Sequence, residues 1–370
     1  MGLLKEEMRR LGSLIMEAAD ATAVPAGGAL AVDRHKFSAF IEERLTAFPD
    51  LELIRQEVTF LPEGEVIVAA GPLASPGLSR VIASLTGREQ LFFHDAIAPI
   101  VDASTIDMEK AFFASRYGKG EGSDYLNCPF DKEQYLAFYH ELVNAQVHPL
   151  HDFEKEKHFS GCMPIDSMAR FGPETICHGP LKPVGLELPS GGEAYAVVQL
   201  RKENIEGSMY NLVGFQTRLT QGEQRRVFRM IPGLEQAEFL RYGAMHRNTY
   251  IDSPKLLTED LRLIAEPRLS FAGQITGVEG YVESAASGLM AGIFAAYRRL
   301  GLERPVFPRE SALGSLLAFT HTPKDDFQPM NVNFGLFPPL LTPFRSKKEK
   351  FSLLSQRALE SIDSFKAELR

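Results

Sequence analysis

The stretch 271–288 carries the residue pattern with the clearest chemistry in this sequence. An apolar run typical of a buried strand, residues 269–272, is followed by Gly273, Gly277 and Gly280 and then by a helix-like stretch. Glycines in such a turn let the backbone approach a flat or phosphorylated ligand. The helix that follows directs free N–H groups and the positive end of its dipole towards that ligand. We therefore predict a cofactor site at this turn.

Small residues continue along one side of the helix that is expected after the turn. The members of that side are Ala285, Gly288, Ala291 and Gly292. They predict close packing of the helix against a sheet, as in dinucleotide-binding folds. An isolated glycine-rich turn is more often an ordinary turn beside a packed helix. The length of this pattern favours a cofactor, because it resembles the C-terminal flavin-contacting segment of two-part FAD proteins. Residues 66–71 resemble the strand of those proteins that ends in Ala-Thr-Gly, with Ala70 in place of Thr.

Three cysteines, Cys128, Cys162 and Cys177, are too few and too scattered for a disulfide framework or a Cys-x-x-Cys metal site, and no metal site is predicted. Cys162 lies between Gly161 and Pro164 in a turn that can present its thiol. Because a free thiol has a pKa of about 8.5, its reactivity at neutral pH requires a nearby cation. The local candidates are Lys157, His158 and Arg170. Burial as a small hydrophobic residue is the commoner role of a lone cysteine, and we expect it for Cys128 and Cys177.

The composition is that of a globular protein with room for two domains. The 370 residues are 44% hydrophobic and 24% charged, with a formal net charge of −8. This negative charge excludes a protein that coats nucleic acid by bulk charge, so an RNA contact would require a local basic face. Between Arg218 and Arg247, six arginines stand against three glutamates. A solvated face is the commoner explanation of such a run.

The first ninety residues carry two helical patterns and one strand. The first pattern, with steps of three and four residues, predicts one amphipathic helix with the apolar residues Leu4, Met8, Leu11, Ile15 and Ala18. Asp33 can cap a second helix, whose apolar face would be Phe37, Phe40, Ile41, Leu45 and Phe48. The apolar run 66–71 is expected to form a parallel strand that is buried on both faces.

The pattern from about residue 92 to residue 252 is mixed. Helical spacing near 135–143 alternates with strand-like runs at 195–200 and 210–219. We interpret this stretch as an inserted mixed α+β domain, residues 91–254.

The α/β pattern then returns. A strand at 269–273 is followed by a helix at 281–300, which Gly301 can end, and the tail holds a last amphipathic helix. The predicted fold class is therefore α/β. A Rossmann-like, FAD-binding domain, residues 1–90 and 255–370, encloses the insertion.

Seven longer runs of the sequence resemble a single family. They are residues 3–13, 24–34, 161–165, 182–186, 227–234, 245–249 and 327–331. The family is that of the methylenetetrahydrofolate-dependent tRNA uracil-5-methyltransferases, and blocks of this length are highly specific. The related glucose-inhibited division protein A family, which modifies the wobble uridine, shares the pattern at 273–288. The matches at 161–186 and 227–234 favour the methyltransferases.

This resemblance implies C5 methylation of the T-loop uridine of tRNA. It implies 5,10-methylenetetrahydrofolate as carbon donor and reduced FAD, recharged by NADPH or NADH, as electron carrier. Cys162 is the implied catalytic residue, which either attacks uracil C6 or moves a proton. The residues expected to contact FAD are Ala70, Gly71, Gly273, Gln274, Gly277, Gly280, Tyr281, Glu283 and Ser284. Those expected to contact folate or tRNA are His246, Arg247 and Asn248, and those expected to bind tRNA are Arg225, Arg226 and Arg229.

Members of this family begin with a segment that has no counterpart before residue 3. It comprises a strand, a Gly-x-Gly-x-x-Gly loop and a helix that hold the FAD diphosphate, and then a Cys-Ser-Asn-Ser run. Residues 118–122 are glycine-rich but have the wrong spacing to replace it. The chain is therefore expected to be N-terminally truncated and to hold FAD weakly, with a non-catalytic tRNA-binding remnant as the alternative. Without a leader or a long apolar run, it is expected in the cytoplasm and away from membranes.

Overall fold

The computed structural model describes residues 2–87, 91–118, 122–148, 163–325 and 327–369, without the side chains of 91–96 and 245–247. These residues form two compact units. Unit 1 comprises Met1–Glu17, Asp50–Phe92 and Arg247–Arg370, and unit 2 comprises Ala18–Pro49 and Phe93–His246. No helix in the described ranges is long and apolar enough to cross a membrane.

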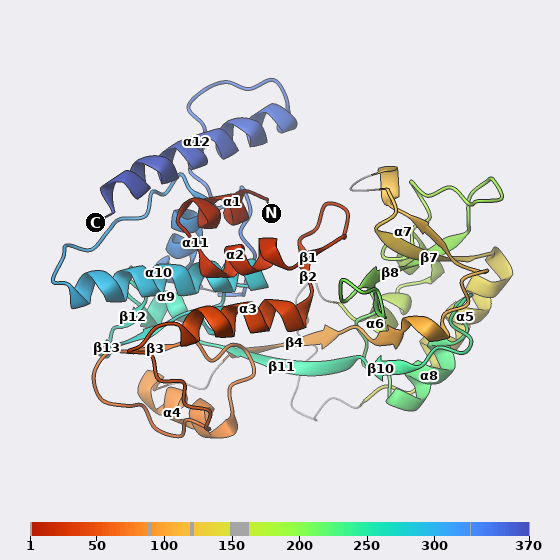
Figure 1. Ribbon diagram of the computed structural model, residues 1–370, viewed down its shortest axis with the longest axis horizontal. Coiled ribbons are helices and arrows are strands. Elements are labelled where there is room, and N and C mark those ends of the chain that lie inside the picture. Colours follow the sequence, from red (N-terminus) through yellow and green to blue (C-terminus); the bar gives the residue numbers. More distant parts are fainter. Residues whose placement is uncertain (1, 88–90, 119–121, 149–162, 326, 370) are drawn as a thin grey trace. The chain divides into compact units, whose positions relative to one another are not determined.

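The elements alternate between helix and strand along much of the chain (Figure 1). The helices are α1 (Gly2–Arg10), α2 (Leu14–Ala21), α3 (Arg34–Thr46), α4 (Pro76–Thr86), α5 (Lys132–Asn144), α6 (Ile165–Ala169), α7 (Pro173–His178), α8 (Gln221–Phe228), α9 (Ser253–Leu256), α10 (Tyr281–Arg299), α11 (Ala312–His321) and α12 (Lys347–Glu368), with short 3-10 turns η1 (Ala103–Thr105), η2 (Arg116–Gly118) and η3 (Gln274–Thr276). The strands are β1 (Ala23–Val24), β2 (Ala31–Val32), β3 (Val66–Val68), β4 (Leu91–Ile97), β5 (Ile100–Asp102), β6 (Phe112–Ala114), β7 (Tyr125–Phe130), β8 (Ala196–Lys202), β9 (Met209–Leu212), β10 (Phe239–Arg241), β11 (Ala244–Tyr250), β12 (Arg262–Leu263) and β13 (Glu266–Phe271).

Unit 1 contains a three-stranded sheet in the order β12-β13-β3. β13 and β3 are parallel, with Leu269 opposite Val66 and Phe271 opposite Val68. The amide of Ala272 extends this register by donating to the carbonyl oxygen of Val68 at 3.0 Å. Since parallel strands end at the same edge of a sheet, the residues that follow β3 and β13 emerge side by side.

The strand at 66–71 differs from its prediction in length and burial. β3 ends at Val68, the side chain of Ile67 is 39% exposed, and Ala69 and Ala70 are exposed. Within the described part of the chain, β3 pairs with β13 on one side and forms an edge of the sheet on the other. The predicted burial on both faces is wrong for the described residues, because an apolar run does not reveal whether other segments cover the faces of the sheet.

Two helices replace the single helix predicted at the N-terminus. Gly12 adopts a φ of +73° between α1 and α2. Its amide donates to the carbonyl of Arg9, and the amide of Ser13 donates to that of Met8, which is the usual closure of a helix by a left-handed glycine. Ser13 then accepts a hydrogen bond from the amide of Met16 through Oγ. The glycine therefore divides one apolar face between two helices.

Glu7 connects the first helix to α11. Its side chain is fully buried, and its carboxylate accepts hydrogen bonds from the amides of Ala312 at 2.7 Å and Leu313 at 2.9 Å. These amides belong to the first turn of α11, where a negative charge meets unpaired N–H groups and the positive end of the helix dipole. Burial raises the pKa of Glu7 to about 7, and the two hydrogen bonds offset only part of this rise.

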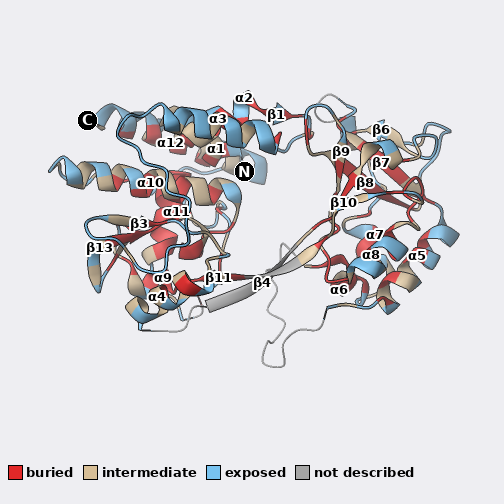
Figure 2. Ribbon diagram, turned by 60° about the horizontal axis from the view of Figure 1, so that its bottom comes forward, coloured by how far each residue is buried: buried red, intermediate tan, exposed pale blue. Residues whose placement is uncertain are grey.

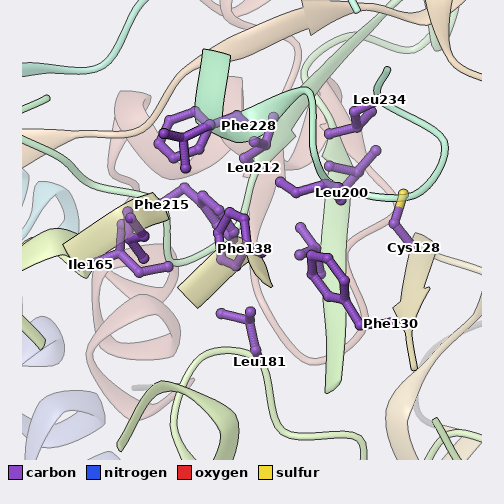
Figure 3. Packing of buried hydrophobic residues seen from close by; sticks show 14 of the residues in the cluster. Cys128, Phe130, Phe138, Ile165, Leu181, Leu200, Leu212, Phe215, Phe228 and Leu234 are labelled. Carbon is purple, nitrogen blue, oxygen red and sulfur yellow. The ribbon is translucent and has the colours of Figure 1, made fainter. Parts of the chain in front are cut away.

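Unit 2 contains a six-stranded sheet in the order β10-β5-β9-β8-β7-β6, with every neighbouring pair antiparallel. Leu200 and Leu212 of this sheet join one buried cluster with Phe138 of α5 and Phe228 of α8 (Figure 3). Cys128 is fully buried in the same cluster, and burial raises the pKa of its thiol to about 12. Cys177 is buried as well. Both cysteines are therefore buried as predicted.

Residues 18–49 cluster with unit 2, whereas the predicted boundaries place all of 1–90 in one domain. Asp33 caps α3 as predicted, by accepting from the amides of His35 and Lys36. The same carboxylate also accepts from the amide of Ile205 at 3.3 Å, which joins the start of α3 to the loop after β8. This hydrogen bond is one of several long-range contacts that join residues 18–49 to the rest of unit 2.

The predicted apolar face of α3 is not buried. No residue of α3 is buried, and Figure 2 shows this helix largely in the pale blue of exposed residues. Phe48, which follows the helix, is 61% exposed. The helical period was correct, but the described residues place no layer over this face.

Three other helices follow their predictions. α5 covers the predicted stretch 135–143, and α10 covers 281–299 before Gly301, whose φ is +65°, ends it. α12 is the amphipathic helix predicted in the tail, and its buried residues are Leu354, Ala358, Ile362 and Phe365. Long periodic segments with a clear cap were therefore predicted correctly.

Replacing Glu7 with Gln is expected to remove a pH-dependent part of the stability. A carboxyl group with a pKa of about 7 in the folded protein and 4.5 in the unfolded chain takes up a proton on folding between these values. The unfolding free energy of the wild type should therefore fall as pH rises from about 4.5 to 7, by up to about 3 kcal/mol. Urea unfolding of the wild type and of Glu7→Gln at pH 5 and pH 8 measures the difference.

Glu6→Gln is the matched control, because Glu6 lies on the same helix with an exposed side chain. It should keep the pH dependence of the wild type. The assignment would be contradicted by an equal pH dependence in the wild type and in Glu7→Gln.

Candidate functional site

At the edge formed by the carboxyl ends of β3 and β13, few other atoms lie close to the backbone of Gly71 and Gly273. Ala70 is exposed and Gly71 has a φ of +68°, with no atom within 4 Å of the position that a Cβ would take. Gly273 has a φ of +80°, and its nearest neighbours at that position are atoms of Ser284 at 3.9 Å. This edge, called the β3–β13 edge below, therefore has room for a flat group against the main chain.

Hydrogen bonds within the turn hold Gly273 in this conformation. Its amide donates to Oγ of the buried Ser287 at 3.0 Å. Its carbonyl oxygen accepts from the amide of Thr276 at 2.9 Å and from Oγ1 of the same residue at 2.8 Å. The turn is thus fixed before any ligand arrives, which is the preorganisation that a binding site needs.

Gly277 serves packing instead of ligand approach. Its φ is +80°, and a Cβ there would lie 2.5 Å from Cζ of Phe327. Met330 donates its amide to the carbonyl of Gly277 at 3.1 Å, and Glu279 donates its amide to the carbonyl of Met330 at 3.0 Å. Residues 327–332, called the strap below, therefore lie directly against the glycine-rich turn.

Three further predicted cofactor residues contact the strap or the turn itself. A Cβ on Gly280 would overlap Oε2 of Glu283, a buried side chain whose Oε1 accepts from the amide of Val332 at 3.3 Å. Gln274 donates through Nε2 to Oε2 of Glu279 at 2.6 Å. The strap completes this network, since Asn331 donates through Nδ2 to the carbonyl of Glu279 at 2.7 Å. Gln274, Gly280 and Glu283 thus shape the turn.

The start of α10 brings the remaining predicted cofactor residues next to this turn. Tyr281 is 95% exposed and Ser284 is half-buried. Gly280 caps the helix without a side-chain hydrogen bond, so the first N–H groups of α10 have no side-chain cap. The structure therefore collects all nine predicted cofactor residues around one end of β3, β13 and α10.

Of the small residues predicted to pack α10 against a sheet, Ala291 is buried, whereas Gly288 and Gly292 are not. A Cβ on Gly288 or Gly292 would meet nothing within 4 Å, and Gly292 is exposed. The buried side of α10 consists of Glu283, Ala286, Ser287, Met290, Ala291 and Phe294. Close sheet packing through Gly288 and Gly292 is therefore wrong for the described residues, because the buried side of the helix is rotated away from them.

Residues 246–248 directly precede two contacts with the β3–β13 edge. Thr249 donates its amide to the carbonyl of Pro72 at 2.9 Å, and Ile251 donates its amide to that of Ile275 at 2.9 Å. Asn248 is buried, whereas the side chains of His246 and Arg247 lie outside the described residues. The backbone thus brings the end of β11 beside Gly71 and the turn after β13.

Cys162, the predicted catalytic residue, lies outside the described residues, as do Lys157 and His158. The chain that follows it is well anchored. Asp166 is buried and accepts from the hydroxyl of Thr217 at 2.9 Å, from the amide of Arg218 at 2.9 Å and from Nε of Arg218 at 3.2 Å. Arg218 belongs to the predicted basic run, and this buried ion pair removes it from any RNA-binding surface.

The three arginines predicted to bind tRNA have intramolecular partners. Arg225 donates to the hydroxyl of Tyr242 at 2.6 Å. Arg226 pairs with Glu223 at 2.7 Å and also with Glu141. Arg229 donates to the carbonyl of Ala237 at 2.9 Å. An RNA phosphate would have to compete with these contacts.

The amino-acid sequence does not reveal the strap as the partner of the glycine-rich turn. Phe327, Met330 and Asn331 belong to a run that resembles a family, and nothing in that run points to the turn. A glycine spacing shows that something approaches the backbone, but it does not say whether this is a ligand or an aromatic ring from a distant segment.

Comparison with known proteins gives three consistent results. The family model described as glucose inhibited division protein A matches residues 1–303. A methylenetetrahydrofolate–tRNA-(uracil-5-)-methyltransferase TrmFO from Heliobacterium modesticaldum is 58% identical over 371 residues, covering 100% of this chain and 84% of the relative. The protein of the same name from Enterococcus faecalis is 56% identical over 362 residues, covering 97% and 83%.

Among solved structures, GidA of Aquifex aeolicus has a similar fold. Its form II crystal structure aligns with a TM-score of 0.67 at 17% sequence identity, covering 99% of this chain and 65% of that chain. The form I structure gives a TM-score of 0.68 and covers 68% of that chain. These neighbours confirm the predicted fold class, an α/β fold with an inserted domain.

Replacing Gly277 with Ala is expected to lower stability and flavin retention together. The new methyl group would lie 2.5 Å from the ring of Phe327, and the φ of +80° disfavours any side chain. Strain and lost packing should cost about 2–4 kcal/mol. Thermal unfolding and the absorbance of bound flavin per chain measure both effects.

Gly288→Ala is the matched control, because its methyl group would meet no atom within 4 Å and helix propensity favours Ala by about 1 kcal/mol. It should melt at or above the wild-type temperature. Equal losses in the two variants would show that the strap does not explain the requirement for Gly277.

Proposed function

The chain belongs to the methylenetetrahydrofolate-dependent tRNA (uracil-5-)-methyltransferases, and from this membership we propose that it methylates C5 of a uridine in tRNA. The observation that carries the proposal is the 58% identity to such an enzyme over the entire chain. The carbon donor is 5,10-methylenetetrahydrofolate, which the names of the relatives specify. The target is the T-loop uridine, and the product is ribothymidine.

The β3–β13 edge fits a flavin. The open space above Gly71 and Gly273 is a cradle that a Cβ would fill at either position, and Ala70 adds a small side chain beside it. The start of α10 supplies N–H groups next to this space. Bound FAD would supply the electrons that convert the transferred methylene into a methyl group. The strap keeps the turn in shape for that role through Phe327 and Met330.

Activation of the uracil requires a separate group. C5 of uracil is a weak nucleophile until a nucleophile adds to C6, and a thiolate is well suited to this addition. Cys162 supplies the thiol in this proposal. Of its local cation candidates, Arg170 is described, and it is exposed at the end of α6. His246, Arg247 and Asn248 are proposed to contact the folate or the tRNA.

The remaining assignments follow from the family. NADPH or NADH is the proposed electron source for the flavin, and the cytoplasm is the proposed location. Wobble-uridine modification is a second candidate, because the family model that matches residues 1–303 is named after glucose inhibited division protein A. The identity of 17% to GidA of Aquifex aeolicus, against 58% to the methyltransferase, favours the T-loop uridine.

The position and presence of the methyl group distinguish these functions. The visible absorption of the purified chain is recorded first, to measure bound flavin. The chain is then incubated with an unmodified tRNA transcript, 5,10-methylenetetrahydrofolate, FAD and NADPH. Nuclease digestion and mass spectrometry should locate one added methyl group in the T-loop. Modification at the wobble uridine would support the second candidate, and tRNA binding without flavin or methylation would indicate a non-catalytic remnant.

Cys162→Ser is expected to fold and to retain flavin as the wild type does, but to lose methyl transfer by at least about 100-fold, since a hydroxyl is a far weaker nucleophile than a thiolate. The assay is the T-loop methylation just described. The control is Cys177→Ser, in which the hydroxyl can take over the hydrogen bond from Sγ to the carbonyl of Tyr195. Full activity of Cys162→Ser would refute the catalytic role.

A further inference from the structure

Tyr117 of η2 combines exposure with backbone strain. Its side chain is 63% exposed, and its backbone has φ +59° and ψ +26°. Among the described non-glycine residues, Leu261 alone shares a positive φ, and it is fully buried. A left-handed conformation is unfavourable for a residue with a side chain, and such strain concentrates at functional sites. Burial of the ring does not offset this cost at Tyr117, so the exposed ring requires another explanation.

Gly185 holds the ring of Tyr117 in place. A Cβ on Gly185 would lie 2.8 Å from Cε1, 2.9 Å from Cδ1 and 3.0 Å from Cζ of that ring. The amide of Tyr117 donates to the carbonyl of Gly185 at 3.0 Å. The ring therefore lies on a glycine backbone on one side and keeps most of its surface in solvent. A ring fixed in this way can stack with a flat partner at little entropic cost.

Arg116 places a fixed positive charge beside this ring. Its Nε donates to Oε1 of Gln199 at 2.9 Å, and Nη1 donates to the carbonyl of Val184 at 3.0 Å. Gln199 is itself held by Asn127, to which its Nε2 donates at 3.0 Å. Within the described residues, no carboxylate pairs with Arg116 and Nη2 has no partner. The half-buried guanidinium is thus oriented by neutral groups and keeps donors for an anion.

We propose that Tyr117 and Arg116 form an RNA-docking platform, on which an unpaired base of the tRNA stacks on the Tyr117 ring and its phosphate binds the Arg116 guanidinium. A fixed aromatic ring beside a fixed arginine has the chemistry by which proteins hold unpaired nucleotides. Lys182, exposed in the segment that also contains Val184 and Gly185, adds to the positive charge. This inference rests on the proposed function, because it takes tRNA as the substrate.

The platform differs from the arginines of α8 in what remains available for a ligand. Arg226 is paired with two carboxylates and Arg225 with the hydroxyl of Tyr242. Among the described residues, the partners of Arg116 are neutral, so its charge remains for a phosphate. This contrast favours η2 over α8 as the RNA contact of unit 2.

The test compares the affinity of the full chain for an unmodified tRNA transcript in four variants. Tyr117→Asn removes the ring but keeps a residue that tolerates the left-handed conformation. It should weaken binding about fivefold to hundredfold, which is the usual effect of losing one stacked base. Tyr117→Phe keeps the ring and should bind as the wild type does. Arg116→Gln should lower the slope of log affinity against log salt by about 1, as expected for one lost phosphate contact.

Phe171→Asn is the matched control, since it removes another ring of unit 2 that is 73% exposed. It should leave tRNA affinity unchanged. Thermal unfolding and flavin content are measured on every variant, and the salt slope of Arg116→Gln gives a second readout if Tyr117→Asn unfolds.

The inference is overturned if Tyr117→Asn binds the transcript as tightly as the wild type, or if Tyr117→Phe loses as much affinity as Tyr117→Asn. An unchanged salt slope in Arg116→Gln would overturn the phosphate contact. Failure of the proposed function has a different result: the wild type would bind the transcript, and Tyr117→Asn would weaken this binding, but no uridine would be methylated.

Discussion

The parallel pairing of β3 with β13 is the contact on which the candidate site depends. It sets the register in which Val68 lies opposite Phe271, and it therefore places Gly71 and Gly273 at one edge. Parallel neighbours cannot be joined by a tight turn and require a crossover connection. Here the connection includes residues 93–246, which make up most of unit 2. The chain therefore passes through unit 2 before β13 pairs with β3. The second interruption of unit 1, between Phe92 and Arg247, lies within this connection.

Around this edge, the glycines of one sequence motif have separate physical roles. Gly273 leaves space above the main chain, whereas Gly277 makes room for the ring of Phe327 and Gly280 for the carboxylate of Glu283. One motif thus contains both a surface for a ligand and the packing that keeps this surface in shape. The second role uses a segment, residues 327–332, that lies far away in the sequence, and this explains why the motif extends beyond what a ligand alone would require.

Local features of the fold could be predicted from the sequence, and their partners could not. Asp33 as a helix cap, Gly301 as a helix end and the buried side of α12 depend on neighbours a few residues away. The family could be recognised because its blocks are long. Three other features depend on distant residues: the packing around Gly288, the burial of β3 and the availability of Arg226 for an RNA phosphate. Arg226, for example, pairs with Glu141 of α5, and no periodicity on α8 can reveal that carboxylate. The same limit applied to Tyr117, whose strain becomes visible only in the backbone angles.

The interleaving of the two units has a consequence for how the chain can be divided. The boundary is crossed at 17/18, 49/50, 92/93 and 246/247, so neither unit is one continuous piece of sequence. A fragment that contained only 93–246 would lose several hydrogen bonds to residues 18–49. The amide of Gly27 donates to the carboxylate of Asp124 at 2.8 Å, and the carbonyl of Ala26 accepts from the hydroxyl of Tyr125 at 2.9 Å. The carboxylate of Asp33 accepts from the amide of Ile205 in the loop after β8. A single proteolytic cut therefore cannot release an intact unit, and an N-terminal deletion that extends beyond Glu17 removes parts of both units at once.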